Sequence, residues 1–120
     1  MAATILIADD LSFTRIAQRE ILRERGYRVV GEARDGIEAV ELYQELWPDL
    51  VVLDITMPRM NGLDAIERIL QVDPQARIVI CSALGQQSLI IEAVRAGVKD
   101  FIVKPLRAER ILSAIEKALA

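Results

Sequence analysis

Five polar side chains stand directly after short apolar segments of the sequence, where they could form a site that handles phosphate. Asp9 and Asp10 follow ILIA, and Asp54 follows LVVL. Ser82 follows IVIC, and Lys104 follows FIV. A carboxylate at the end of a buried segment is unusual, because the charged group loses hydration there. An acid pair, a third acid, a hydroxyl and an amine in equivalent places therefore predict one shared site.

The chemistry of this set favours a hard metal ion and a phosphoryl group. Clustered carboxylates repel each other and need a cation to stay ionised together. The chain has no histidine and one cysteine, and oxygen ligands without nitrogen or sulfur favour Mg²⁺ over Zn²⁺. A lysine and a hydroxyl opposite the metal would hold the remaining phosphoryl oxygens. One acid would then be the nucleophile, since carboxylates can form acyl phosphates.

Apolar segments alternate with segments of helical period, and this alternation defines the elements that must position the site. The predicted strands are 4–8, 27–32, 50–53, 77–81 and 99–103, and the predicted helices are 12–25, 36–46, 63–72, 87–96 and 107–119. Strands that alternate with helices indicate the α/β class, with a parallel sheet, right-handed crossovers and helices on both faces. We expect one domain over residues 1–120, with a flavodoxin-like, doubly wound five-stranded sheet.

The strand order assumed for this sheet is 2-1-3-4-5, which makes the first, third, fourth and fifth strands contiguous. In open α/β sheets, ligands bind at the carboxyl ends of the strands, where the strand order reverses. The five polar side chains would then meet in one pocket. Asp54 would end the central strand, between the acid pair and the Ser82 and Lys104 side, and is the predicted nucleophile.

Each residue also has a structural interpretation when it is taken alone. Asp10 or Ser12 could cap the first helix, and Asn61-Gly62 could form a turn with either residue in the left-handed conformation. Ser82 is an ordinary residue at a strand end, and Lys104 an ordinary surface lysine. The joint placement of the set at neighbouring strand ends favours the functional interpretation.

Composition narrows the class of protein further. The chain is 52% hydrophobic and 4% aromatic, and such an aliphatic core suits a buried parallel sheet. A net charge of −3 without a basic run argues against direct nucleic-acid binding. The first residues lack a basic flank and a long apolar run, so neither a signal peptide nor a membrane span is expected. The single cysteine, Cys81, excludes an intrachain disulfide framework and indicates a reducing cytoplasm.

The first predicted helix carries an apolar pattern that suggests which of its faces packs inward. Phe13, Ile16, Ala17 and Ile21 recur at helical spacing, and Leu22 is a further candidate. We expect this face to cover the sheet.

Taken together, these segments resemble the receiver domain of two-component response regulators, and most closely its stand-alone chemotaxis members. The segments LIADD, LDITMPRMNGLDAI, ICSALGQQ and AGVKDFIVKP occur in the family's order and at its spacing. The resemblance covers the whole chain. It implies that Asp54 is the phospho-acceptor, and that Asp9, Asp10, Asp54 and the backbone carbonyl of Thr56 bind Mg²⁺.

The resemblance also implies roles around the acceptor. Ser82 matches the switch hydroxyl, and Lys104 matches the lysine that pairs with a phosphoryl oxygen, followed by a cis peptide bond to Pro105. Phe101 occupies the switch-aromatic position, without the hydroxyl that a tyrosine there would offer. Thr56 and Leu84 match positions that tune the lifetime of the phosphoryl group. The candidate partner contacts are Ile90, Val103, Leu106 and Arg110.

The function implied by the resemblance is a phosphorylation-dependent signalling switch rather than an enzyme, although it would catalyse its own phosphotransfer and dephosphorylation. The expected partners are a histidine kinase of the chemotaxis type, a flagellar switch protein and a phosphatase. The protein is expected to be a cytoplasmic monomer that contacts neither nucleic acid nor membrane.

Two alternatives stay open at this point. The chain could be a receiver of a phosphorelay or of a DNA-binding regulator. It could also belong to another class, as a flavodoxin-like electron carrier, although no glycine- and hydroxyl-rich phosphate loop follows the first strand. A P-loop enzyme is disfavoured because the pattern G-x-x-x-x-G-K-[ST] does not occur.

Overall fold

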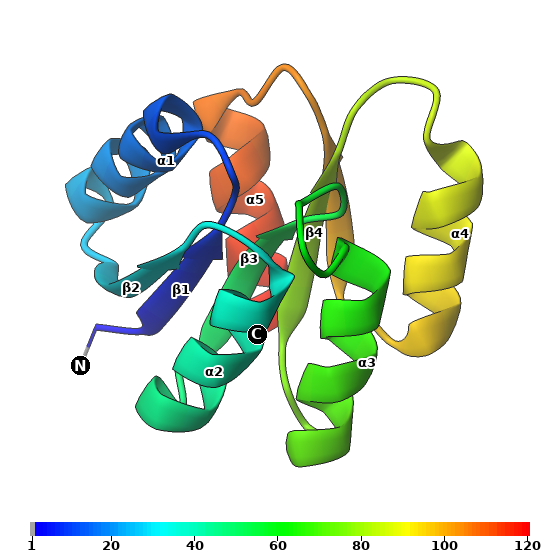
Figure 1. Ribbon diagram of the computed structural model, residues 1–120. Helices are drawn as coiled ribbons and strands as arrows, with labels where there is room; N and C mark the ends of the chain where they lie inside the picture. The colour runs from blue at the N-terminus through cyan, green and yellow to red at the C-terminus, as the bar shows by residue number, and fades with distance from the viewer. Residues whose placement is uncertain (1) are drawn as a thin grey trace.

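The computed structural model describes residues 2–120, which form five strands and five helices in strict alternation (Figure 1). The elements are β1 (Thr4–Ala8), α1 (Ser12–Glu24), β2 (Arg28–Ala33), α2 (Gly36–Leu46), β3 (Leu50–Asp54), α3 (Gly62–Val72), β4 (Ile78–Ser82), α4 (Gln87–Ala96), β5 (Asp100–Val103) and α5 (Ala108–Leu119). All strand pairs are parallel, and the order is β2-β1-β3-β4-β5. The predicted fold class and strand order are confirmed.

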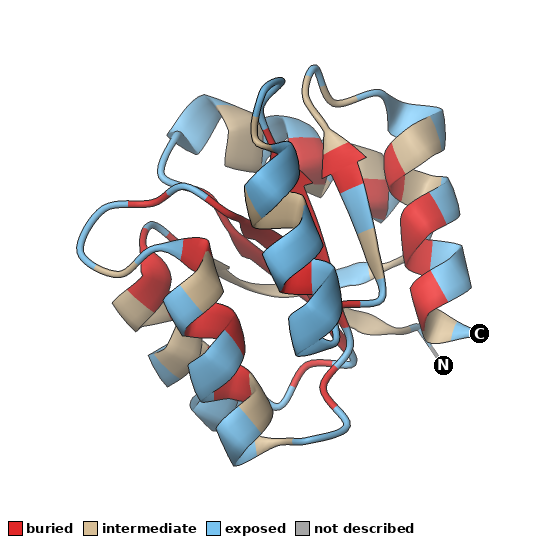
Figure 2. Cartoon of the chain, turned by 90° about the vertical axis from the view of Figure 1, so that its right-hand side faces the viewer, coloured by how far each residue is buried: buried red, intermediate tan, exposed pale blue. Residues whose placement is uncertain are grey.

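The helices form two layers, one on each face of the sheet. α2, α3 and α4 cover one face, and α1 and α5 cover the other (Figure 1). Successive residues of a strand point to opposite faces, so Leu6 and Val51 join the core under α2, α3 and α4, whereas Ile7 and Val52 join the core under α5. Every residue of β3 and β4 is buried, and Figure 2 shows these inner strands as continuous buried segments. This double burial is the reason for the unbroken apolar runs in the sequence.

The observed bounds of two strands matter for the site. β3 extends through Asp54 and β4 through Ser82, one residue further than predicted in each case. Both polar residues therefore belong to the last ladder positions of the two central strands. Backbone pairing with the neighbouring strands fixes their direction.

The predicted inward face of α1 is wrong in part. The buried residues of this helix are Gln18 and Leu22, whereas Phe13, Ile16 and Ala17 are exposed. Two guanidinium groups explain this rotation. Arg15 Nη1 donates to the carbonyl oxygen of Asp9 at 2.6 Å, and Arg19 Nη1 donates to Glu32 of β2 at 2.7 Å. These contacts turn the polar side of the helix toward the sheet edge, and leave an apolar stripe in solvent.

The loop between β3 and α3 also differs from the prediction. Asn61 caps α3, since its side chain accepts a hydrogen bond from the backbone N–H of Asp64 at 3.0 Å. The left-handed residue of this loop is Arg59, with φ of 63°, and neither Asn61 nor Gly62 adopts that conformation. Gly62 is required for another reason: a Cβ atom there would lie 2.4 Å from Ile55 Cα. The glycine lets α3 begin against the end of β3.

Within residues 2–120, no helix is both long and apolar enough to cross a membrane.

Candidate functional site

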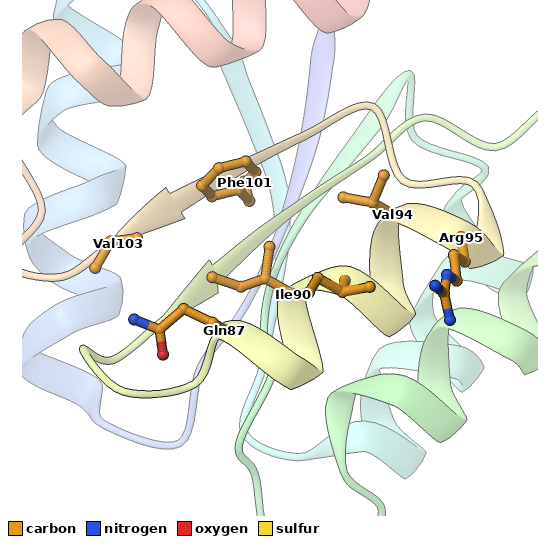
Figure 3. A pocket seen from close by; sticks show the side chains of 7 residues that line it. Gln87, Ile90, Val94, Arg95, Phe101 and Val103 are labelled. Carbon is orange, nitrogen blue, oxygen red and sulfur yellow. The ribbon is translucent and has the colours of Figure 1, made fainter.

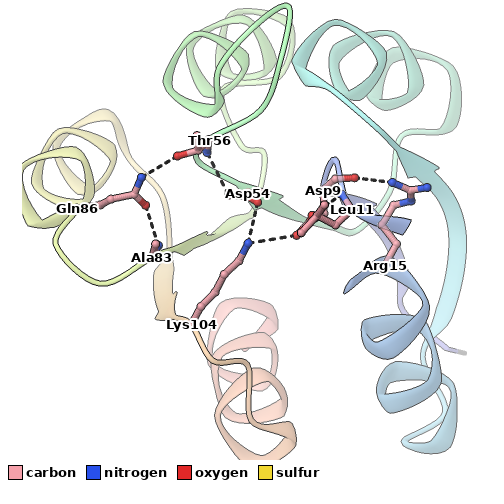
Figure 4. A network of polar contacts seen from close by, with 8 residues as sticks. All are labelled: Asp9, Leu11, Arg15, Asp54, Thr56, Ala83, Gln86 and Lys104. Carbon is pink, nitrogen blue, oxygen red and sulfur yellow. Dashed lines mark hydrogen bonds and ion pairs between the residues drawn. The ribbon is translucent and has the colours of Figure 1, made fainter. Parts of the chain in front are cut away.

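The carboxyl edge of the sheet brings the predicted site residues together, and Figure 4 shows three of them, Asp9, Asp54 and Lys104, in contact there. Asp9, Asp54 and Ser82 are buried, with exposed fractions of 0%, 4% and 0%, while Asp10 is exposed. Carboxylate oxygens of Asp9, Asp10 and Asp54 lie within 4.8 Å of one another. Three acids from two neighbouring strands thus share one small volume, although their like charges repel.

Lys104 supplies the positive charge of this cluster. Its Nζ lies 2.9 Å from Asp54 Oδ2 and 3.6 Å from Asp9 Oδ2, so the ammonium group stands between the two acids (Figure 4). Burial disfavours the charged ammonium, but the hydrogen bond to Asp54 and the charges of Asp54 and Asp9 outweigh it and raise the pKa of Lys104. The lysine therefore stays charged at neutral pH. The predicted cis peptide bond between Lys104 and Pro105 is present.

Both oxygens of the Asp54 carboxylate have a donor. Oδ2 accepts from Lys104, and Oδ1 accepts from the backbone N–H of Thr56 at 3.0 Å. These two donors fix the orientation of the carboxylate at the edge of the sheet. Thr56 lies in the loop after β3, and Lys104 directly follows β5. A carboxylate fixed in this way is suited to nucleophilic attack on phosphorus.

Two buried oxygens of the site lack a hydrogen-bond partner within residues 2–120. They are Asp9 Oδ2 and Ser82 Oγ. Asp9 Oδ1 does accept from the Leu11 N–H at 2.9 Å, yet burial and the charges of Asp54 and Asp10 raise the pKa of Asp9. Buried polar atoms normally find partners, so these two atoms are available to a group bound at this edge of the sheet. An oxygen-only donor set of this kind fits Mg²⁺.

The capping interpretation of the first helix is not supported. The N-cap residue of α1 is Leu11, and no side chain makes a capping hydrogen bond there. Asp10 and Ser12 therefore do not cap α1. The exposed Asp10 carboxylate contributes to the acidic cluster instead.

Replacing Asp9 by asparagine is expected to stabilise the metal-free protein by about 1 kcal/mol. The change removes a buried charge that faces Asp54 and Asp10, while the asparagine oxygen can still accept from the Leu11 N–H. The same variant should lose most of the stabilisation that Mg²⁺ gives the native protein, because one charged ligand is absent. Urea unfolding in a chelator and in Mg²⁺ measures both effects.

The control for Asp9→Asn is Glu45→Gln, which neutralises an exposed carboxylate on α2. It should leave the response to Mg²⁺ as in the native protein. A less stable Asp9→Asn variant that still gains native-like stability from Mg²⁺ would contradict the proposed ion site.

Sequence reasoning missed an ion pair between Asp35 and Arg59 that joins two loops near the site. Asp35 caps α2 by accepting from the Glu38 N–H at 2.8 Å, and its other oxygen accepts from Arg59 Nε at 2.9 Å. Burial disfavours ionisation of Asp35, but these hydrogen bonds outweigh it and lower the pKa of its carboxyl group. The ion pair joins the loop before α2 to the loop after β3. It therefore supports the backbone that follows Asp54.

Cys81 is the residue before Ser82 on β4, and its surroundings disfavour the reactive thiolate form. It is buried, and burial next to the charge of Asp54 raises the pKa of its thiol to about 12. The thiol therefore stays protonated and packs as a small apolar group under α5.

The candidate partner contacts divide into separate places. Ile90 and Val103 line one hollow of about 580 Å³ together with Phe101, between α4 and β5 (Figure 3). Leu106 lies at a different hollow, beside Phe13 of α1. The Arg110 side chain bonds the carboxylate of Asp100 and the carbonyl oxygen of Phe101. Of the four candidates, Ile90 and Val103 line the same hollow as the predicted switch aromatic, Phe101, whereas Arg110 contacts its backbone.

Sequence comparison assigns the chain to a family. Residues 5–116 match the response regulator receiver domain, so the chain belongs to this family of signalling switches. The flavodoxin-like electron carrier is thereby ruled out as the class of this protein.

Individual members of this family resemble the chain over nearly its whole length. The chain is 53% identical over 117 residues to the chemotaxis protein CheY of Thermotoga maritima, covering 98% of each sequence. It is 56% identical over 119 residues to CheY of Bacillus subtilis, covering 99% of each. Among solved structures, it resembles a chain of the CheX–CheY–BeF₃–Mg complex from Borrelia burgdorferi with a TM-score of 0.94 at 36% identity, covering 98% of this chain and 90% of that one.

Proposed function

We propose that this protein is the phospho-accepting response regulator of a chemotaxis system, with Asp54 as the acceptor. The observation that carries the proposal is the buried Asp54 carboxylate, held by Lys104 Nζ at 2.9 Å and by the Thr56 N–H at 3.0 Å beside two further acids. The chemotaxis assignment is supported by the names of its relatives. The proposal includes a single cytoplasmic domain that acts as a switch and not as a multiple-turnover enzyme.

The transfer step follows from the groups at the sheet edge. A carboxylate oxygen of Asp54 attacks the phosphorus atom of a phosphohistidine. This phosphohistidine belongs to a partner kinase, because this chain has no histidine. The new bond is O–P, the P–N bond breaks, and the imidazole nitrogen keeps the electron pair. Lys104 would hold a phosphoryl oxygen and neutralise part of the negative charge that the phosphoryl group brings. Hydrolysis of the acyl phosphate, by the domain itself or with a phosphatase, returns the carboxylate.

Mg²⁺ is the ion that fits this site. Asp9, Asp10, Asp54 and the backbone carbonyl of Thr56 would hold it, and when bound it neutralises the charge of the phosphoryl oxygens. The structural support for this ion is the acidic cluster itself, in which the buried Asp9 Oδ2 accepts no hydrogen bond and has a 3.6 Å ion pair with Lys104.

The switch is proposed to begin at Ser82. Its Oγ is buried and lacks a partner within residues 2–120, and a phosphoryl group on Asp54 would offer an acceptor. Movement of Ser82 toward that group leaves space that Phe101 can fill. Phe101 is 36% exposed at the hollow between α4 and β5, so its position would report the state of Asp54 on that surface. The phosphoryl group shifts the equilibrium only by its differential contacts with the two states.

The apolar hollow between α4 and β5 is the proposed contact for a flagellar switch protein. Ile91 and Val94 are about half exposed there, at 51% and 49%. Ile91→Ser is expected to weaken binding of the beryllofluoride-activated protein to such a partner by roughly tenfold, because one buried apolar side chain is lost from the contact. Calorimetric titration of the activated protein with the partner measures this change in affinity.

The control is Ile16→Ser, which changes an exposed isoleucine on α1, at 47% exposure. Equal weakening by both substitutions would place the contact elsewhere.

The alternative function is that of a receiver in a phosphorelay or in a DNA-binding regulator, which shares the same chemistry. Phosphoryl transfer from labelled histidine kinases distinguishes the two. We expect transfer within seconds from a chemotaxis-type kinase, and much slower transfer from kinases of other pathways. Transfer that is slow from the chemotaxis-type kinase and fast from another would favour the alternative.

A further inference from the structure

Gln86 joins the two loops that flank the acceptor. Its Oε1 accepts from the backbone N–H of Ala83 at 2.7 Å, and its Nε2 donates to the hydroxyl of Thr56 at 2.8 Å (Figure 4). Ala83 directly follows Ser82, and Thr56 donates its own N–H to Asp54. One side-chain amide thus connects the residue beside the switch hydroxyl to the residue that orients the acceptor.

This arrangement is not a helix cap. Gln86 is the N-cap residue of α4, yet its side chain accepts no hydrogen bond from the first turn of that helix. Gly85, with φ of 89° and open space around it, turns the loop, and Gln86 bonds back to Ala83. The Gln86 amide therefore does not cap α4. It bonds Thr56 in the loop between β3 and α3 instead.

The backbone of Ser82 is held by pairing with β5, where the Lys104 N–H donates to its carbonyl oxygen at 2.8 Å, so the side chain and the residues that follow are the parts that can shift. Ser82 Oγ has no partner within the described chain, and Leu84, which follows Ala83, is 79% exposed. Among the hydrogen bonds of residues 83–86, the one from Gln86 Nε2 to the Thr56 hydroxyl reaches the β3–α3 loop, and the one from the Ala83 N–H to Gln86 Oε1 ties Ala83 to that contact. Displacement of Ala83 toward Asp54 would have to break or stretch them.

We propose that Gln86 is a positioning residue, a clasp that holds the β4–α4 loop in its resting place and so opposes the switch. The inference rests on the proposed function, since it concerns the movement of Ser82 toward a phosphoryl group on Asp54. Each of the two hydrogen bonds contributes a modest net stability to the resting loop. Removing the clasp therefore lowers the free energy needed to reach the activated state.

Gln86→Ala is expected to bind beryllofluoride, with Mg²⁺ present, about fivefold more tightly than the native protein does. The matched control is Gln71→Ala, the same change at an exposed position of α3, which should bind with native affinity. Thr56→Val removes the hydroxyl that accepts from Gln86 and keeps the shape of the side chain. In that background the effect of Gln86→Ala should be clearly smaller, because one of the two bonds is already absent.

Hydrogen exchange gives a readout that does not depend on the phosphoryl mimic. The Ala83 amide should exchange faster in Gln86→Ala than in the native protein, and at the native rate in Gln71→Ala. Native affinity in Gln86→Ala, weaker binding, or an effect that is equal in the Thr56→Val background would overturn the clasp. Failure of the native protein itself to bind beryllofluoride would overturn the proposed function and the regulatory role with it.

Discussion

Replacing Lys104 by methionine is expected to slow phosphorylation of Asp54 by roughly a hundredfold while the protein stays folded. The ammonium group is the positive charge that the structure places between Asp54 and Asp9, at 2.9 and 3.6 Å. In the transfer step the Lys104 ammonium would hold a phosphoryl oxygen. The backbone of β5, which ends one residue earlier, fixes where this side chain begins. Methionine fills a similar volume without the charge. The rate of acyl-phosphate transfer at saturating Mg²⁺ measures the effect.

Two further variants separate the charge of Lys104 from its position. Lys104→Arg keeps the charge but not the compact ammonium, and should recover only part of the rate. Lys99→Met removes an exposed lysine at the other end of β5, and should react as the native protein does. Transfer at the native rate in Lys104→Met would show that the lysine is an ordinary surface residue, and would remove one of the main supports of the site.

Gly62→Ala is expected to destabilise the protein by about 3 kcal/mol or more. A Cβ atom at this position would lie 2.4 Å from Ile55 Cα and 2.7 Å from the carbonyl oxygen of Asp54. Both atoms belong to the backbone that ends β3, so neither can turn away as a flexible side chain could. The start of α3 would have to move off the strand, and the acceptor would move with it. Urea unfolding measures the loss.

Gly26→Ala is the matched control, because it isolates backbone strain from steric overlap. Gly26 has φ of 93°, and a Cβ atom there would meet nothing within 4 Å. Its cost should be about 1 kcal/mol, from the left-handed backbone alone. Equal destabilisation by the two substitutions would mean that α3 can shift easily, and that the contact at Gly62 does not position Asp54.

Much of the fold follows from the sequence because its signals are local. Unbroken apolar runs such as LVVL mark strands buried on both faces, and a polar residue at the end of each run marks the edge where the strands open to solvent. Asp54 and Ser82 could be placed this way, since strand direction and parallel pairing carry them to the same edge. The same reasoning could not fix the rotation of α1. There Arg15 and Arg19 form polar contacts with Asp9 and Glu32 that have no periodic signal.

The residues that sequence reasoning missed act across loops. Gln86 bonds Thr56 across 30 positions, and Arg59 bonds Asp35 across 24. Such pairs depend on how two loops meet in space, and neither hydrophobic period nor turn composition reports that. Asp35 alone carried a usable signal, since an acid before a helical pattern is a common N-cap. The left-handed residue of the β3–α3 loop was likewise misplaced, because Asn and Gly favour that conformation but Arg59 adopts it.

The most direct test of the central claim is the intact mass of the protein after incubation with Mg²⁺ and a small acyl-phosphate donor. We expect a gain of one phosphoryl group, about 80 Da, that is lost in a chelator and absent in Asp54→Asn. Asp64→Asn, which alters an exposed carboxylate on α3, should gain the group as the native protein does. A native protein that gains no mass under these conditions, or an Asp54→Asn variant that gains it equally, would contradict the assignment of Asp54 as the phospho-acceptor.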